Sequence, residues 1–461
     1  LKSTEPPVAG KLNEFALSVS RQGSDPQPAT IRLIQVPKEW GVSESFELGL
    51  EQETQDLKIE IPDSYSETSG VIRYELTSEY QGSEFTITGD LPVQGIVPAP
   101  VKLMAYPERI EFDGLTFRQQ IVITGHDTQG ALRDWTRDAV FQATDTSVVE
   151  VTGSVIHAKS DGVTQLRVNA GGKELLLPIE VRNSGVKQPI RFESDVLAAL
   201  SKQGCNSGAC HGSPSGKGMF RLSLRAFDKK LDELTLIRED FGRRLNLVEP
   251  EESLLLLKPL MKINHGGGKK LHESDPAYTI LRNWIAGGAA ADAPGTPRCV
   301  RLEVYPHEKR LLSLDGGRQQ LAATAWFADG SRKDVTALAV YESSDTSVAE
   351  VDETGLIRSV GVGEAVILVR FLEHIESIPV MFIEDDADYR WASEPPLNYI
   401  DGLVDAKLKQ LQYSPSPLCS DSEFIRRVYL DLLGVLPSVS ETRLFLNDAT
   451  DDKRGKLIDE L

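Results

Sequence analysis

Residues 118–148 read RQQIVITGHDTQGALRDWTRDAVFQATDTSV, and residues 318–348 read RQQLAATAWFADGSRKDVTALAVYESSDTSV. The two stretches share RQQ, D-x-T and DTSV at an offset of 200 positions. They belong to two copies, residues 101–183 and 300–384, which are built from short alternating segments such as Gln120–Thr124. Short strands at this spacing, separated by turn residues, are typical of a β-sandwich. The sequence therefore predicts two β-sandwich repeats in one chain.

Further landmarks recur in the two copies. Tyr106-Pro107 corresponds to Tyr305-Pro306, one residue off the common offset, and both copies run to a late glycine, Gly162 and Gly361. The D-x-T, DTSV and late-glycine landmarks resemble those of bacterial immunoglobulin-like domains of group 2. Domains of that family act mostly as surface spacers or adhesion modules, so the resemblance implies a passive spacer.

The regions outside the repeats differ in their pattern of apolar and polar residues. Residues 1–97 alternate between apolar and polar positions and predict a further β-sandwich-like domain, followed by a stiff linker at Pro98–Pro100. Residues 187–298 and 396–461 are helical instead. Apolar residues recur at helical spacing in 192–200, 230–239, 275–287, 399–408 and 424–433. We therefore expect a multidomain, mainly β chain with immunoglobulin-like sandwiches, an inserted α-helical domain and a helical C-terminal fragment.

Charge excludes some partners. The chain carries a formal net charge of −19, which argues against nucleic-acid binding and against adhesion to an anionic membrane. Residues 187–298 differ, with 17 Lys or Arg and 13 Asp or Glu. No apolar run approaches the roughly 18 residues of a membrane span. The sequence begins at Leu1 without a leader and ends within a helix, so we expect the rest of a parent chain to follow residue 461.

The most informative motif is Cys205-Asn-Ser-Gly-Ala-Cys210-His211. A c-type haem needs two thiols for its vinyl groups and an imidazole directly after the second thiol. The usual spacing is C-x-x-C-H, and here four residues separate the cysteines. Small turn-forming residues between them keep the two sulfurs within reach of one haem. The motif predicts one covalent haem c, with His211 as the proximal ligand of its iron.

Two other interpretations of the motif remain open. One is a local disulfide between Cys205 and Cys210 with a bystander His211. The other is a zinc site, although the second pair of ligands that zinc would need is absent from this segment. Cys299 and Cys419 are isolated in the sequence, and a disulfide between them is a further option.

Two segments resemble parts of large planctomycete surface proteins. Gly204–Gly212, together with Gly266–Gly268 and the closing Leu281-x-x-Trp284, resembles their cytochrome-c-like domains. Asn398–Asp401 and Arg426–Gly434 resemble the start of the cytochrome-associated domain of unknown function in the same proteins. The resemblance implies a cytochrome-c-like domain at 187–298 and a truncated cytochrome-associated domain at 396–461.

The resemblance also implies further haem contacts. The distal ligand is expected from the loop before the last helix, where His265 takes precedence over Met261 and Met219. The expected pocket walls include Phe220 and Trp284. Arg243 and Arg244 are expected to pair with the haem propionates, because Arg forks match carboxylates.

The first functional hypothesis is electron transfer by this haem, in a periplasmic or cell-surface protein whose redox partner the sequence does not identify. The chain would then be an electron-transfer module rather than a catalyst. One alternative is a haem sensor or peroxidase-like enzyme with an open sixth site. Another is a structural or adhesive surface protein without haem. No catalytic triad, phosphate-binding loop or H-E-x-x-H motif is present in the sequence.

Overall fold

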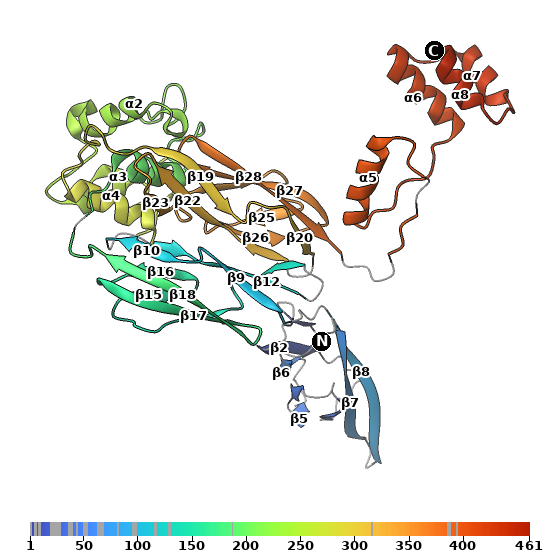
Figure 1. Ribbon diagram of the computed structural model, residues 1–461, viewed down its shortest axis with the longest axis horizontal. Coiled ribbons are helices and arrows are strands. Elements are labelled where there is room, and N and C mark those ends of the chain that lie inside the picture. The colour runs from blue at the N-terminus through green and yellow to red at the C-terminus, as the bar shows by residue number, and fades with distance from the viewer. Residues whose placement is uncertain are drawn as a thin grey trace. The chain divides into compact units, whose positions relative to one another are not determined.

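Figure 1 shows the chain as a computed structural model. From residue 99 onward the structure describes every residue except 115–117, 128–130, 187, 315–316, 385–388 and 393–394. Before residue 99 it describes 2–3, 7, 11–18, 29–35, 40–42, 45–48, 54–61, 69–80 and 83–94. Pro98 of the expected linker lies outside these residues. By its internal contacts the chain divides into two units, Leu1–Asp385 and Asp386–Leu461.

The N-terminal strands form two four-stranded sheets. One has the order β1-β2-β6-β4 and the other the order β5-β3-β7-β8. Their bounds are β1 (Lys2–Ser3), β2 (Lys11–Ser18), β3 (Ala29–Gln35), β4 (Gly41–Val42), β5 (Ser45–Leu48), β6 (Thr54–Ile61), β7 (Ser69–Tyr80) and β8 (Ser83–Gln94). Phe15, Trp40, Ile59 and Ile72 lie in their common core. The expected β character of this region is confirmed for the residues that the structure describes.

The first repeat contains three small sheets. Their strand orders are β13-β12-β9, β10-β18-β17-β14 and β11-β16-β15, and β10 pairs with β18 in parallel. The bounds are β9 (Lys102–Tyr106), β10 (Ile110–Asp113), β11 (Arg118–Gln120), β12 (Val122–His126), β13 (Leu132–Asp134), β14 (Val140–Ala143), β15 (Val149–Thr152), β16 (Val155–Ala158), β17 (Gly162–Ala170) and β18 (Lys173–Arg182).

The second repeat has the same topology. Its strand orders are β19-β22-β23, β20-β28-β27-β24 and β21-β26-β25, with β20 parallel to β28. The bounds are β19 (Cys299–Tyr305), β20 (Arg310–Ser313), β21 (Arg318–Gln320), β22 (Ala322–Phe327), β23 (Arg332–Asp334), β24 (Val340–Ser343), β25 (Ala349–Val351), β26 (Leu356–Ser359), β27 (Gly363–Phe371) and β28 (His374–Ile383). The repeat seen in the sequence is thus a repeat of structure.

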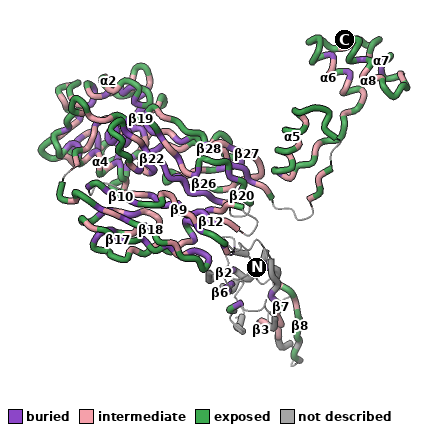
Figure 2. The backbone as a smooth tube through the Cα atoms, in the orientation of Figure 1, coloured by how far each residue is buried: buried purple, intermediate pink, exposed green. Residues whose placement is uncertain are grey.

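The period-two pattern of the sequence places the core of each repeat. Along β17, Thr164, Leu166, Val168 and Ala170 are buried, while the residues between them point outward. Figure 2 shows such buried stretches within the strands of both repeats. Because one face of each strand is covered, the register of the sheet is fixed by its apolar positions.

The late glycine of each repeat stands where its strand passes close to the DTSV segment. A Cβ at Gly162 would lie 2.8 Å from a methyl carbon of Val148, and one at Gly363 would lie 3.0 Å from a methyl carbon of Val348. The partner of Gly162 is therefore Gly363, and the correspondence with Gly361 expected from the sequence is wrong by two residues.

The segment between the repeats is helical. A helix is wound as a π-turn over η1 (Phe192–Leu197) and continues as α1 (Ala198–Lys202). The other elements are η2 (Leu224–Ala226), α2 (Lys229–Glu233), η3 (Leu234–Arg238), η4 (Glu239–Gly242), η5 (Pro250–Glu252), α3 (Leu254–Leu257) and α4 (Pro276–Ala286). The helices expected at 192–200, 230–239 and 275–287 are confirmed in place, with the second divided between α2 and η3.

This helical segment shares one hydrophobic core with the second repeat. The core joins Phe192, Leu256 and Trp284 of the segment to Val304 and Phe382 of the repeat. The first repeat has a separate core around Trp135 and Ile123. Residues between the repeats in sequence therefore belong with the second repeat in packing.

The second unit consists of helices α5 (Tyr399–Gln410), α6 (Asp421–Leu433), α7 (Val439–Asn447) and α8 (Lys453–Glu460). Asn398, Ser420 and Ser438 form capping boxes at the starts of the first three. Ile425 and Phe445 lie in its small core. The expected C-terminal helices are confirmed. In the described part of the chain, no helix is long and apolar enough to cross a membrane.

Candidate functional site

The loop that carries the two cysteines follows directly from helix α1. Gly204 leaves the helix with a φ of 69°, a conformation that suits glycine. The His211 N–H donates to the Cys205 carbonyl at 3.0 Å and closes the loop. A Cβ at Gly212 would lie 2.1 Å from the Asn206 carbonyl oxygen, so this approach requires glycine. The motif therefore folds as a compact turn.

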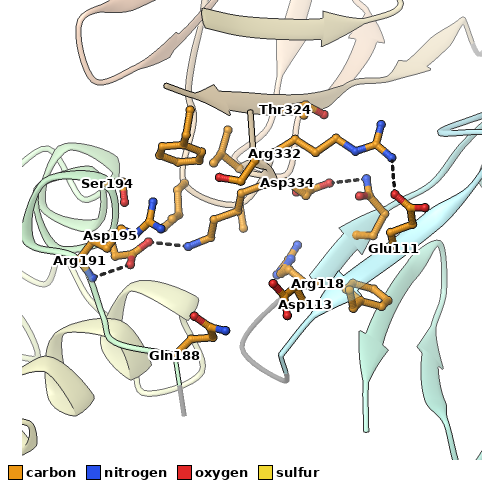
Figure 3. Close-up of a pocket in the computed structure, with 18 of the residues that line it drawn as sticks. Glu111, Asp113, Arg118, Gln188, Arg191, Ser194, Asp195, Thr324, Arg332 and Asp334 are labelled. Carbon is orange, nitrogen blue, oxygen red and sulfur yellow. Dashed lines mark hydrogen bonds and ion pairs between the residues drawn. The ribbon is translucent and has the colours of Figure 1, made fainter. Parts of the chain in front are cut away.

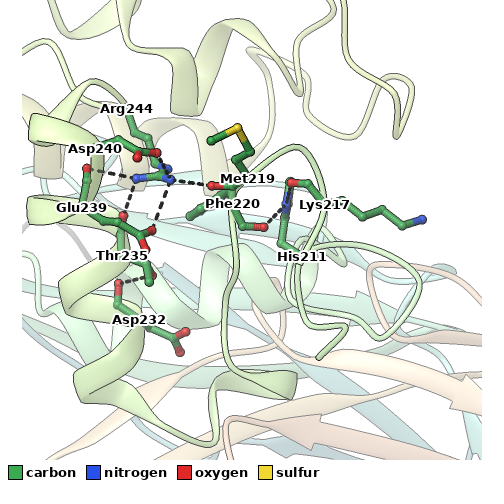
Figure 4. Close-up of polar contacts among 9 residues, drawn as sticks. All are labelled: His211, Lys217, Met219, Phe220, Asp232, Thr235, Glu239, Asp240 and Arg244. Atoms are coloured by element: carbon green, nitrogen blue, oxygen red, sulfur yellow. Dashed lines mark hydrogen bonds and ion pairs between the residues drawn. The ribbon is translucent and has the colours of Figure 1, made fainter. Parts of the chain in front are cut away.

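The structure brings His211 and His265 together. Their ring centroids are 6.3 Å apart and their planes are inclined by 19°. The Nδ1 atom of His211 lies 3.1 Å and 3.0 Å from the carbonyl oxygens of Lys217 and Phe220, as Figure 4 shows. The Nδ1 atom of His265 lies 2.7 Å from the Gly268 carbonyl oxygen. Carbonyl oxygens only accept, so each Nδ1 donates and each Nε2 is left as an acceptor.

Burial lowers the pKa of His211, with the charge of Arg244 adding to the shift, so this imidazole is neutral at pH 7. The ring also packs against Phe220, with centroids 4.5 Å apart. The pair thus consists of two close imidazoles that are oriented by backbone carbonyls.

Arg244 is held by the protein itself. Its guanidinium donates to the carbonyl oxygens of Thr235, Glu239 and Met219 and pairs with Asp240 at 2.8 Å. It also lies 4.6 Å from the centre of the Phe220 ring (Figure 4). These contacts fasten the loop before residue 220 to the helices after residue 229. Arg243, by contrast, is exposed.

The remaining predicted site residues are divided between core and surface. Trp284 is buried, donates from Nε1 to the Ala290 carbonyl at 2.8 Å and packs near Phe192. Met219 is 85% exposed and Met261 45% exposed. Trp284 therefore belongs to the core, whereas the two methionines lie at the surface.

The cysteines are free thiols in this structure. Cys205 packs against the core of the helical segment, and burial raises the pKa of its thiol to about 12. Cys299 is buried, and burial raises the pKa of its thiol to about 11. Both thiols are protonated at neutral pH, and the structure shows neither disulfide that the sequence left open.

A second site lies where the repeats meet. Strand β13 packs against β21, and β11 packs against β23. The backbone N–H of Gln320 donates to Oδ2 of Asp134 at 2.6 Å, and the backbone N–H of Gln120 donates to Oδ2 of Asp334 at 2.8 Å. Each repeat thus supplies the same donor and the same acceptor to the other, as in the interface of a two-fold symmetric dimer.

The D-x-T motif orients the carboxylates of these two aspartates. In each repeat the other oxygen, Oδ1, accepts the backbone N–H of the threonine two residues later, at 2.8 Å for Thr136 and 2.9 Å for Thr336. The threonine hydroxyl in turn accepts the backbone N–H of the adjacent strand, Ile123 or Ala323. Oδ2 is then left to reach the opposite repeat.

Two equivalent tyrosines, one from each repeat, also meet at this interface. The rings of Tyr106 and Tyr305 stack with centroids 4.5 Å apart and planes 4° apart. The hydroxyl of Tyr106 donates to Glu303 at 3.0 Å, and that of Tyr305 lies 3.2 Å from the hydroxyl of Thr124. Burial raises the pKa of Tyr106 to about 12.

Buried charge also crosses this interface. Arg318 pairs with Asp138 at 2.7 Å, and both side chains are nearly inaccessible to solvent. Burial raises the pKa of Asp334 to about 6, against the opposing effect of its bonds from Gln120 and Thr336. Burial raises the pKa of Asp134 too. The interface therefore rests on buried, titratable groups.

A cavity of about 1200 Å³ opens beside this interface. Figure 3 shows its walls, which come from the first repeat, the second repeat and the helical segment. Arg332 reaches Glu111 across it at 3.5 Å, and Lys333 reaches Asp195 at 2.5 Å. The sequence did not predict this site. The repetition of polar motifs in the two repeats could have indicated it, because a self-complementary contact needs the same motif on both sides.

Comparison with known proteins gives one family match. Residues 399–461 match the family model PSCyt2, described as a protein of unknown function (DUF1549). This match agrees with the expected start of a cytochrome-associated domain in the C-terminal unit. No curated protein matches the chain.

Similar solved structures are distant. Domains 4–9 of the surface layer protein SbsC share 11% identity over 77% of this chain and 39% of theirs, with a TM-score of 0.24. An endo-fucoidan hydrolase of glycoside hydrolase family 107 shares 9% over 39% of this chain and 27% of its own, with a TM-score of 0.21. A protein of unknown function from Porphyromonas gingivalis shares 10% over 38% and 94%, with a TM-score of 0.16. The chain spans about two fifths of the SbsC fragment, and TM-scores of this size carry no argument about function.

The prediction of an electron-transfer haem protein is corrected by these findings. Within the described residues, no three His, Cys, Asp or Glu side chains are grouped so as to hold a metal ion. Cys205 is half-buried and its thiol is protonated, and Arg244 is bound by protein groups. The alternative of a structural surface protein agrees better with the findings.

Several finer predictions are not tested by these observations. The mainly β, multidomain fold with helices is confirmed, whereas the immunoglobulin-like and cytochrome-c-like assignments and the domain boundaries stay predictions. The same holds for haem c as a cofactor and for the roles of Cys210, His211 and His265 toward it.

Proposed function

We propose that this chain is a structural part of a bacterial cell-surface protein. In this proposal residues 101–183 and 300–384 are immunoglobulin-like spacer repeats that hold each other at a fixed angle. The helical segment between them is carried on the second repeat. The observation that supports the proposal most directly is the reciprocal pair of hydrogen bonds between Asp134 and Gln320 and between Asp334 and Gln120.

Rigidity is the property that such an interface supplies. Tandem domains that are joined by a linker alone move relative to each other by default. Here the contact adds a stacked tyrosine pair and a buried ion pair between Arg318 and Asp138 to the reciprocal hydrogen bonds. Buried polar groups of this kind are costly to separate, because each would be left without its partner. A spacer that keeps its shape under load needs this kind of contact.

The helical segment is fixed in the same way. Lys333 of the second repeat pairs with Asp195, and Lys202 donates to the carbonyl oxygens of Ala339 and Glu353. The shared core completes the attachment. Residues 188–384 would then move as one piece together with the first repeat.

Hydrogen exchange tests the structural part of the proposal. In the intact chain, the amides of Gln120 and Gln320 are expected among the slowest to exchange, and at equal rates, because one opening event exposes both. Fast exchange at either amide, with slow exchange in the strand cores, would mean that the repeats separate freely and would contradict the proposal.

Antibody labelling tests the location. Antibodies against the repeats are expected to label intact cells that express the protein, before any permeabilisation. Labelling that appears only after the outer envelope is opened would place the protein in the periplasm and contradict the surface role.

A further inference from the structure

The two halves of the repeat interface differ at one position. Arg318 of the second repeat pairs with Asp138 of the first at 2.7 Å. The 200-residue offset makes Arg118 the counterpart of Arg318 and Leu338 the counterpart of Asp138. The first repeat therefore presents the same guanidinium to a position that holds a leucine instead of a carboxylate.

Arg118 consequently lacks the partner that its counterpart has. Its Nε is buried and meets no hydrogen-bond acceptor among the described residues, as is also true of the Nε of Arg318, so the ion pair with Asp138 is what distinguishes the two arginines. The nearby Asp334 carboxylate already accepts the backbone N–H groups of Gln120 and Thr336. The charge of Arg118 is also felt at His157, its partner in the β11–β16 ladder, where it adds to burial in lowering the pKa.

The space beside Arg118 is open to a ligand. Arg118 and Leu338 both line the cavity of about 1200 Å³ between the repeats and the helical segment, and Figure 3 shows Arg118 on the wall of the first repeat. Ser194, on the opposite wall, is 4% exposed and its hydroxyl has no hydrogen-bond partner among the described residues. Clefts at the junctions between domains are common binding places for small-molecule ligands.

Among the described residues, no acidic side chain of the cavity forms an ion pair with Arg118, although its charge is felt at the Asp334 carboxylate. Glu111 and Glu180 pair with Arg109, and Asp195 pairs with Lys333. These carboxylates hold the walls together, and none of their ion pairs involves Arg118. An unpaired guanidinium in such a place is a strong site for an anion, because a charge-assisted fork matches a carboxylate in shape and charge.

We propose that Arg118 binds the carboxylate of a small acidic ligand in this cavity, in the position that Asp138 occupies for Arg318. The ligand is a soluble acid about the size of a sugar acid, and its carboxylate completes the second half of the interface. This inference goes beyond the structural role and does not depend on the surface location of the protein.

Ligand-induced thermal shifts on the chain of residues 1–461 test the proposal, with glucuronate and succinate as probes and glucose as the neutral control. Both acids are expected to raise the unfolding midpoint in a saturable way, and glucose is expected to have no effect. Arg118→Gln is expected to weaken binding of the acids roughly tenfold or more, since a charged hydrogen bond of this kind is worth about that factor. Arg358→Gln, which removes an exposed arginine of the second repeat, leaves binding unchanged.

Leu338→Asp provides a second, independent variant. It supplies the missing carboxylate from within the chain, so it is expected to raise the midpoint without ligand and to abolish the shift with glucuronate. The proposal is overturned if neither acid shifts the midpoint of the wild-type chain, or if glucose shifts it equally. Retention of the full shift in Arg118→Gln also overturns it, whether or not Leu338→Asp folds.

Discussion

The two repeats present the same residues to each other but do not end in the same environment. Around Arg318 the interface contains a buried carboxylate, that of Asp138, at 2.7 Å. Around Arg118 the equivalent carboxylate is replaced by Leu338, and a cavity begins. The shared residues fix how the repeats pack, whereas the one that differs leaves room for a further partner. A departure from internal symmetry therefore identifies the chemically unsatisfied half.

The largest expected effect distinguishes the Arg318 side of the interface from the Arg118 side. Arg318→Leu removes the ion-pair partner of the buried Asp138 and is expected to lower the free energy of unfolding by about 3–5 kcal/mol. Arg118→Leu removes a guanidinium that has no carboxylate partner and is expected to change it by less than about 1 kcal/mol. Urea denaturation of both variants measures the contrast. Equal losses would show that the two halves are energetically alike.

The next largest effect is expected from removing the reciprocal hydrogen bonds between the repeats. Asp134→Ala and Asp334→Ala each remove the acceptor of two buried backbone N–H groups, one in each repeat. Each is expected to cost about 2–4 kcal/mol of unfolding free energy, because a buried unsatisfied donor costs about 1–3 kcal/mol. Asp345→Ala, which removes an exposed turn carboxylate, is the matched control and should cost much less. A loss confined to one of the two interface variants would argue against a reciprocal contact.

The acidity of Asp334 gives a pH dependence of intermediate size. Its pKa in the folded chain is about 6, above the ordinary value of 3.8 for an aspartate side chain, so the folded state holds the extra proton between these values. Stability is therefore expected to fall as pH rises from about 4 through 6, by on the order of 3 kcal/mol.

Comparison with Asp334→Asn isolates this contribution, because the variant cannot titrate at that position. The difference in unfolding free energy between the two proteins should change across pH 4–6 and be constant above pH 7. A difference that does not vary with pH would mean that this carboxyl has an ordinary pKa.

The smallest effect concerns the stacked tyrosines. Tyr106→Phe and Tyr305→Phe keep the ring contact and remove one hydroxyl each. Tyr106→Phe is expected to cost about 1.5 kcal/mol, because its hydroxyl donates to the Glu303 carboxylate, and Tyr305→Phe only about 0.5–1 kcal/mol. Thermal unfolding of both variants ranks them, and the reverse order would contradict the assignment of these partners.

The repeat could be predicted from the sequence because period-two burial and turn residues leave a local pattern. The same holds for the helix at Pro276–Ala286 and for the capped helices after Asn398. The contact between Asp134 and Gln320 could not be predicted, since no local pattern tells which surface of a sandwich meets its neighbour. The duplication of Asp-x-Thr in one chain was the available signal.

The cysteine motif, in contrast, shows what the sequence alone cannot decide. Spacing alone allows a haem, a disulfide or a zinc site, because each asks for the same residue types. What distinguishes them is the partial burial of Cys205, the hydrogen bonds and ion pairs of Arg244 and the residues around His211, and none of these can be read from the sequence. The structure places His211 and His265 close together, with ring centroids 6.3 Å apart, but their roles toward a haem stay predictions.

The central claim is that the two repeats are held together as one rigid piece by side chains that cross between them. A double-mutant cycle on Arg318→Leu and Asp138→Leu, followed by urea denaturation, tests it most directly. Each single variant is expected to be strongly destabilised and the double variant to recover most of the loss, which gives a coupling energy of at least about 2 kcal/mol. Additive losses, with no coupling between the two positions, would contradict the claim.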